Sequence, residues 1–148
     1  MKQMVGAYEK LGGNIVCALE IPIEDTPSYG VIDPGYRDGP ITEVKGLVEK
    51  PAAGTAPSNP ILPGRYILQP EVMRILETQA AGAGGEIQLT DAMAQMIGQQ
   101  PFHGMTFDGK RYDCGSKQGY VEANLALALA HPEIGCDIRV MAEKLLAQ

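Results

Sequence analysis

Residues 14–21, Asn-Ile-Val-Cys-Ala-Leu-Glu-Ile, constrain the fold most, because they form a nearly continuous apolar run. A strand with one face in water alternates apolar and polar residues, whereas a continuous run is typical of a strand covered on both faces. We therefore predict a strand inside a sheet, with other structure packed on each side of it. A chain of 148 residues, 45% of them hydrophobic, is long enough for one domain with a real core.

Helical and extended patterns alternate along most of the remaining chain. Apolar residues at helical spacing predict helices over 1–11, from Pro70 to about Leu76, over 87–97, over 117–131 and over 138–146. Extended patterns predict strands over 29–32, 41–48, 64–68 and 102–107, and a further extended segment over 110–114. Turn-forming residues predict a surface turn over 34–40 and a loop over 52–63. This order predicts an α/β domain with a mixed sheet.

Charge and composition exclude several classes of protein. The net charge is −6, and no run of Lys and Arg is longer than Lys110-Arg111, so we expect no binding of nucleic acid. No secretory signal opens the chain, and no segment approaches the roughly 18 apolar residues of a membrane span, so we expect a soluble cytoplasmic protein. Three widely spaced cysteines fit neither a disulfide framework nor a zinc site.

The pair Glu49-Lys50 is the first candidate for chemistry, because it follows a predicted strand at the edge where open α/β sheets bind ligands. A glutamate can accept hydrogen bonds from sugar hydroxyls, and a lysine can pair with a phosphate. The alternative is an ordinary exposed Glu–Lys pair. Gly30, between Tyr29 and Val31, marks either a bulge or a point where a ligand approaches the backbone closely.

The sequence contains few motifs that indicate phosphate or metal binding. The glycines Gly82, Gly84 and Gly85 precede Glu86 with the wrong spacing for a nucleotide-phosphate loop, and no lysine follows them. Asp113 lies two residues after the cation pair Lys110-Arg111, where its carboxylate could ligate magnesium or complete a turn. A protein of net negative charge that handles a phosphate ester needs local cations, and a divalent metal is their usual supplement.

Six segments in series carry a resemblance to a known family. They are residues 30–32 (Gly-Val-Ile), 48–51 (Val-Glu-Lys-Pro), 57–59 (Pro-Ser-Asn), 64–68 (Gly-Arg-Tyr-Ile-Leu), 82–91 (Gly-Ala-Gly-Gly-Glu-Ile-Gln-Leu-Thr-Asp) and 109–115 (Gly-Lys-Arg-Tyr-Asp-Cys-Gly). In order and separation they resemble the bacterial UTP–glucose-1-phosphate uridylyltransferases, over roughly residues 5–145. Each motif alone is weak, but six in the same order are hard to obtain by chance.

The resemblance implies the C-terminal, mixed-sheet portion of a Rossmann-like nucleotidyltransferase domain. Residues 1–148 would be its sugar-phosphate-binding half, because the glycine-rich Gly-Thr-Arg loop and a metal-binding aspartate of the family's nucleotide-binding N-terminal half are absent from this sequence. The implied reaction joins UTP and glucose-1-phosphate into UDP-glucose and pyrophosphate, with Mg²⁺ neutralising the triphosphate. Such a displacement needs positioning and charge neutralisation more than covalent catalysis.

The same resemblance assigns roles to individual residues. Lys50 would hold the attacking sugar phosphate and is the expected catalytic residue, Glu49 would hold sugar hydroxyls, and Gly30 would meet the sugar through its backbone. Three further roles are that Gly64 lies against the sugar, that Glu86 and residues 88–91 support the pocket wall, and that Asp113 lies near the phosphates and Mg²⁺. Pro60 and Pro63 depart from the family pattern, and Pro63 removes a backbone donor beside Gly64.

Two alternatives remain open at the level of sequence. The absent triphosphate loop favours a non-catalytic phosphosugar-binding or assembly module. A related nucleotidyltransferase with another nucleotide or sugar is also open, because the Glu-Lys-Pro element is shared among relatives, although the segments over 84–91 and 110–115 favour the uridylyl branch. Open sheet edges in half of a domain invite association, so we also expect a homo-oligomer.

Overall fold

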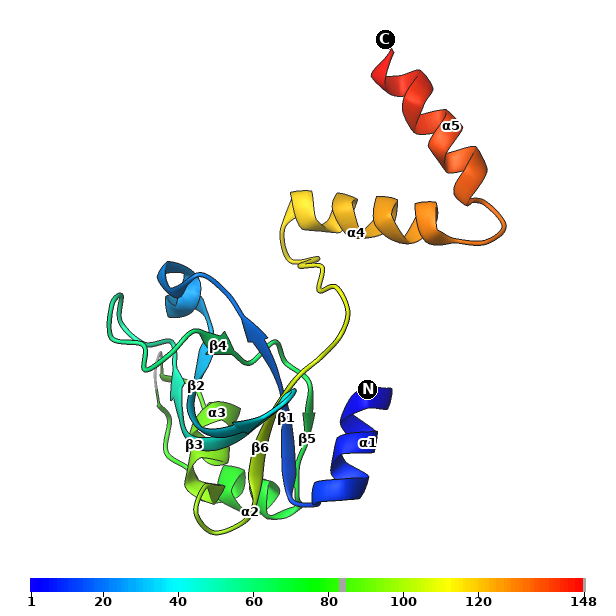
Figure 1. Cartoon of the computed structure of the whole chain (residues 1–148). Coiled ribbons are helices and arrows are strands. Elements are labelled where there is room, and N and C mark those ends of the chain that lie inside the picture. The colour runs from blue at the N-terminus through cyan, green and yellow to red at the C-terminus, as the bar shows by residue number, and fades with distance from the viewer. Residues whose placement is uncertain (83–84, 148) are drawn as a thin grey trace. The chain divides into compact units, whose positions relative to one another are not determined.

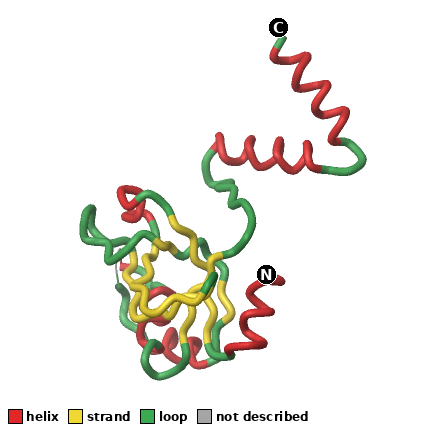
Figure 2. Tube along the Cα trace, viewed as in Figure 1, coloured by secondary structure: helices red, strands yellow, loops and turns green. Residues whose placement is uncertain are grey.

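The computed structural model describes residues 1–82 and 85–147, which form two compact units, Met1–Phe107 and Asp108–Gln148 (Figure 1). All the strands belong to the first unit, and the second consists of helices and loops in the part that is described (Figure 2). In chain order the first unit contains α1 (Lys2–Leu11), β1 (Asn14–Glu20), the 3-10 helix η1 (Ile23–Ser28), β2 (Gly30–Asp38), β3 (Ile41–Glu49), β4 (Pro60–Ile61), β5 (Tyr66–Ile67), α2 (Glu71–Thr78), α3 (Leu89–Met96) and β6 (Phe102–Thr106).

The six strands form a mixed sheet in the order β4-β2-β3-β6-β1-β5. β1 and β6 are parallel, and the other pairs are antiparallel. Because β4 pairs with β1 as well as with β2, the pairing runs in a closed circuit through β4, β2, β3, β6 and β1. The prediction of an α/β fold with a mixed sheet is confirmed.

β1 is covered on both faces, as its continuous apolar run predicts. Val16 and Ala18 belong to the core that includes residues of α2 and α3. Ile15 and Cys17 point the other way and pack with Met4 of α1. Alternate residues of a strand face opposite sides of a sheet, so a strand with helices on both sides needs apolar residues at every position.

A buried asparagine fixes the start of β1. Asn14 is fully buried, and its Nδ2 donates to Gln100 Oε1 at 3.1 Å and to the Pro101 carbonyl at 3.3 Å. Its Oδ1 accepts from the Gln69 N–H at 2.9 Å. This one amide therefore ties β1 to the segment before α2 and to the segment before β6, and its own polar atoms are satisfied.

Several element boundaries differ from the predictions. β2 continues to Asp38, where a surface turn over 34–40 was expected, because two register shifts beside Pro34 accommodate a residue without an N–H. β4 lies inside the expected loop over 52–63, and β5 is shorter than the expected strand over 64–68. Residues 110–114 form no strand.

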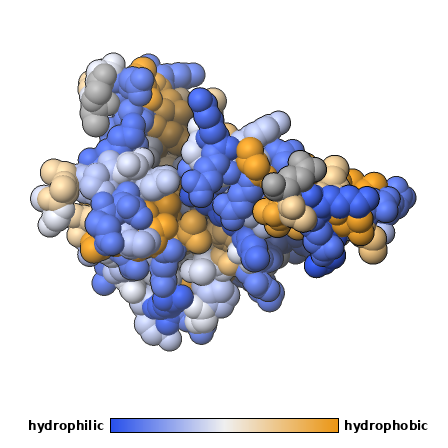
Figure 3. All heavy atoms as spheres, turned by 90° about the horizontal axis from the view of Figure 1, so that it is seen from above, coloured by the Kyte–Doolittle hydropathy of each residue, from blue (hydrophilic) through white to orange (hydrophobic). Residues whose placement is uncertain are grey.

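The second unit contains α4 (Lys117–Ala130) and α5 (Gly135–Leu146). Ser116 caps α4, because its Oγ accepts the Gly119 N–H at 3.0 Å. The buried residues of the two helices are Gly119, Ala123 and Gly135, while larger apolar side chains such as Leu127 stay exposed. Figure 3 shows hydrophobic residues interspersed with hydrophilic ones at the surface. Among the helices described, none is long and apolar enough to cross a membrane.

Candidate functional site

The candidate site lies where β2 begins and β3 ends. Gly30, the first residue of β2, pairs with Glu49, the last residue of β3. The Lys50 N–H donates to the Tyr29 carbonyl at 3.0 Å, and the Leu62 N–H donates to the Gly30 carbonyl at 2.9 Å. Three backbone segments therefore meet at Gly30, and Glu49 and Lys50 belong to one of them.

Gly30 is buried beneath three side chains that leave no room for a larger residue. A Cβ at this position would lie 3.0 Å from Glu49 Oε2, 3.1 Å from Leu62 Cδ1 and 3.2 Å from Thr90 Oγ1. The register of β2 on β3 is continuous from Gly30 to Asp33, so the glycine marks a close approach to the backbone and not a bulge.

Thr90 and Tyr66 extend this cluster. Thr90 is buried in the first turn of α3, and its hydroxyl faces Gly30 beside the Glu49 carboxylate. Burial, and after it the negative charge of Glu49, raises the pKa of the Tyr66 phenol above its ordinary value, which places Tyr66 within the field of that carboxylate. The Glu49 carboxylate and the Thr90 hydroxyl, which both lie over Gly30, form a set of groups suited to polyhydroxylated ligands.

Sequence reasoning missed Tyr66 and Leu62, and it included Thr90 as one residue of the expected pocket wall over 88–91. In the structure Gln88 is the N-cap of α3, so Thr90 lies in the first turn of the helix. Tyr66 is placed by the pairing of β5 with β1, where Val16 is its partner, and Leu62 follows β4. These pairings join residues far apart in the chain, and no local spacing predicts them.

Lys50 has an unusual backbone. Its φ is 44°, and among residues 1–82 and 85–147 it is the one non-glycine residue with a positive φ. The side chain is exposed, while the following Pro51 is buried. A lysine pays a conformational cost in this region, and such outliers cluster at functional sites.

Gly64 and Glu86 have less defined surroundings. Gly64 is exposed with φ 89°, and a Cβ there would meet nothing within 4 Å. The glycine is therefore needed for its backbone conformation, and packing does not require it. Glu86 is exposed, and its Oε2 accepts from Gln88 Nε2 at 3.2 Å. Ala83 and Gly84 of the glycine-rich motif lie outside the described residues. Neither Gly64 nor Glu86 is among the three described residues nearest to a Cβ at Gly30.

Asp113 belongs to the second unit, and its carboxylate completes a turn. Its Oδ1 accepts the Gly115 N–H at 3.0 Å, and its Oδ2 lies 3.5 Å from Arg111 Nη2. In the described part of the chain, no group of three or more His, Cys, Asp or Glu side chains could hold a metal ion. Asp113 thus offers a single carboxylate, which Mg²⁺ can use only together with other ligands such as phosphate oxygens.

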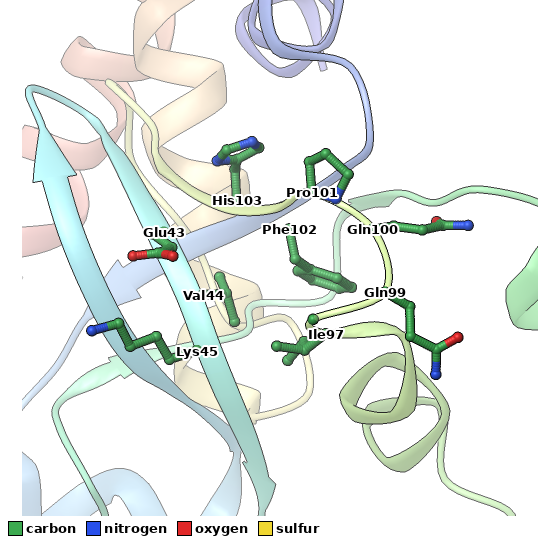
Figure 4. Close-up of a pocket in the computed structure, with 10 residues that line it drawn as sticks. Glu43, Val44, Lys45, Ile97, Gln99, Gln100, Pro101, Phe102 and His103 are labelled. Carbon is green, nitrogen blue, oxygen red and sulfur yellow. The ribbon is translucent and has the colours of Figure 1, made fainter.

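A cavity of about 440 Å³ lies between β3 and the segment that joins α3 to β6 (Figure 4). Val44, Ile97 and Phe102 point toward its centre, while Glu43 and Lys45 project from the other face of β3. None of the residues that line it is a predicted site residue. The cavity is therefore separate from the cluster around Gly30.

Comparison of the sequence with known families matches residues 1–129 to the model described as nucleotidyl transferase. A UTP–glucose-1-phosphate uridylyltransferase of Staphylococcus epidermidis is 45% identical over 145 residues, which are 98% of this chain and 50% of the relative. One of Komagataeibacter xylinus is 54% identical over 115 residues, 78% of this chain and 40% of the relative. The chain thus spans about half the length of the curated relatives it matches.

Solved structures give the same result. A UDP-glucose pyrophosphorylase complexed with UDP-glucose has a TM-score of 0.80 at 41% identity, over 85% of this chain and 48% of that one. A UTP-bound enzyme of the same kind from Acinetobacter baumannii has a TM-score of 0.82 at 32% identity, over 97% of this chain and 49% of that one.

Proposed function

This chain belongs to the nucleotidyl transferase family, and we propose that it provides the sugar-phosphate site of a UTP–glucose-1-phosphate uridylyltransferase. The whole reaction joins glucose-1-phosphate to UTP, giving UDP-glucose and pyrophosphate. Two facts support this choice of substrate: relatives at 45–54% identity carry that activity in their names, and a similar structure contains UDP-glucose. The observation that carries the proposal is the convergence of Glu49, Leu62 and Thr90 on the bare backbone of Gly30.

The chain's own residues would bind and orient one substrate. The Glu49 carboxylate accepts hydrogen bonds from sugar hydroxyls, and the missing side chain at Gly30 leaves room for Glu49 and Thr90 to lie close together over the backbone. The Lys50 ammonium pairs with the sugar phosphate, whose oxygen attacks the α-phosphorus of UTP while pyrophosphate leaves. Lys50 holds this oxygen in line and offsets its charge, so no covalent intermediate is needed.

Binding measurements on the chain test the proposal. We expect glucose-1-phosphate and UDP-glucose to bind in a calorimetric titration. Lys50→Ala should weaken the binding of glucose-1-phosphate about 10- to 100-fold, which corresponds to the loss of one charge-assisted hydrogen bond. Lys45→Ala, within the strand β3 that precedes Lys50, is the matched control and should bind as the unmodified chain does. If neither ligand binds, the proposed substrate is wrong.

The alternatives give distinct results. A non-catalytic phosphosugar-binding module would bind glucose-1-phosphate without UTP-dependent formation of UDP-glucose by any form of the protein. A relative with another nucleotide would form product from a different nucleoside triphosphate in the same assay. Uridine specificity is therefore tested by offering UTP, dTTP, ATP and GTP in parallel.

Magnesium, oligomeric state and location stay predictions. Asp113 fits a Mg²⁺ site only as one carboxylate among ligands supplied elsewhere, and no step above depends on it. Exposed apolar side chains such as Leu127 and Leu145 on α4 and α5 support the proposal of a homo-oligomer. A cytoplasmic location is proposed together with the enzyme class.

A further inference from the structure

Glu49 and Lys50 are neighbours in sequence, and an ordinary strand would keep them apart. Successive side chains of a strand point to opposite faces of the sheet. Glu49 is the last residue of β3, so a Lys50 in extended conformation would place its side chain on the other face. Two adjacent residues can bind one ligand together only if the backbone departs from the extended form between them.

Lys50 makes that departure. In a strand φ lies near −120 to −140°, so the observed φ of 44° rotates Cβ about the N–Cα bond by roughly 160–180°. This rotation carries the Lys50 Cβ across the plane of the peptide between the two residues. It then lies on the same side of that plane as the Glu49 Cβ.

The unusual backbone is held from both sides. Before it, the Lys50 N–H is bonded to the Tyr29 carbonyl at 3.0 Å, beside the Gly30–Glu49 pair. After it, the ring of Pro51 is buried. Neither the residue type nor its neighbour favours this conformation, because a lysine avoids positive φ and a following proline biases the residue before it toward the extended form. A conformation disfavoured twice persists only where the surroundings impose it.

We propose that Pro51 is a positioning residue, whose buried ring holds Lys50 in the left-handed conformation and so turns its side chain to the face of β3 that carries Glu49. The identity of the ligand rests on the proposed function. Pro51 acts through Lys50 and touches no substrate. The pair Glu49-Lys50 can then hold the sugar and the phosphate of one molecule at the same time.

A binding cycle tests this role on the full chain. Pro51→Gly removes the ring. We expect this change to weaken the binding of glucose-1-phosphate about tenfold or more, because one charge-assisted contact is lost, and to leave the affinity for glucose unchanged. In a Lys50→Ala background the same change should have no further effect. Pro57→Gly, at an exposed proline of the same loop, is the matched control. An equal effect of Pro51→Gly with and without the lysine, or no effect at all, overturns the proposal.

A stability cycle tests the backbone without any ligand. With Pro51 present, Lys50→Gly should unfold at a temperature roughly 2–6 °C higher than Lys50→Ala, because glycine alone adopts positive φ without strain. In the Pro51→Gly background this difference in unfolding temperature between Lys50→Gly and Lys50→Ala should vanish or change sign. If the chain binds no glucose-1-phosphate, the proposed function fails, and this cycle still decides the role of Pro51. Equal stability of the two variants beside Pro51 contradicts it.

Discussion

Replacing Gly30 by alanine tests the crowding at the site most simply. The added Cβ would lie 3.1 Å from Leu62 Cδ1 and 3.2 Å from Thr90 Oγ1, both on buried residues, and 3.0 Å from Glu49 Oε2. Ordinary carbon contacts begin near 3.5 Å, so each neighbour must retreat by about 0.3–0.5 Å. Overpacking of this kind costs roughly 1–3 kcal/mol. We expect about 1–2 kcal/mol, because the half-exposed Glu49 can swing away.

The assay is thermal unfolding followed by titration with glucose-1-phosphate. A loss of this size lowers Tm by roughly 3–8 °C in a chain of this length. The displacement of Glu49 should also weaken the binding of glucose-1-phosphate about tenfold or more, because at least one hydrogen bond to a charged group is lost. Adding Thr90→Ala should restore part of the stability, because it removes one of the three close contacts.

The control for this substitution is Gly6→Ala. Gly6 lies in α1, and a Cβ there meets nothing within 4 Å. Alanine should therefore stabilise the protein by roughly 0.5–1 kcal/mol through its helix propensity. Unchanged stability and affinity in Gly30→Ala would refute the packing described around Gly30.

Three further predictions follow from other contacts. Glu49→Gln should lower the pKa of the Tyr66 phenol toward its ordinary value, because the Glu49 charge helps to raise it. Ultraviolet titration measures this pKa, and an unchanged value would show that the Glu49 charge does not act on Tyr66. Burial raises the pKa values of Cys17 and Tyr66, so the folded form keeps these protons to a higher pH than the unfolded chain does. The contribution of these two groups to the free energy of unfolding should be constant below about pH 8 and fall as pH rises through about 9–10 and above, less steeply in Tyr66→Phe. Asn14→Ala should lower the free energy of unfolding by roughly 2–3 kcal/mol, because the groups that bond to this buried amide lose their hydrogen-bond partner. Asn124→Ala, at an exposed position of α4, should change it by about 0.5 kcal/mol or less.

The sequence was informative where the signal is local. The apolar run of β1 predicted a strand covered on both faces, and the end of β3 placed Glu49 and Lys50 at the edge of the sheet. The alternatives for Gly30 stayed open, because only the register of β2 on β3 and the side chains above them separate a bulge from a close approach.

Other features of the site depend on contacts between distant segments. Tyr66 comes within the field of Glu49 because β5 pairs with β1, and the two-residue strand β4 exists because it can pair with both β1 and β2. The positive φ of Lys50 could not be predicted, since neither lysine nor a following proline favours it. Local propensity is overridden at this position by its surroundings, as expected of a functional site.

The central claim is that glucose-1-phosphate binds at the cluster around Gly30, and mapping of amide chemical shifts tests it most directly. On titration with glucose-1-phosphate, the amide signals of Gly30, Lys50 and Leu62 should move together and saturate, and those of Gly98 and His103, beside the cavity of Figure 4, should stay in place. Shifts confined to that cavity, or no shifts at all, would contradict the account.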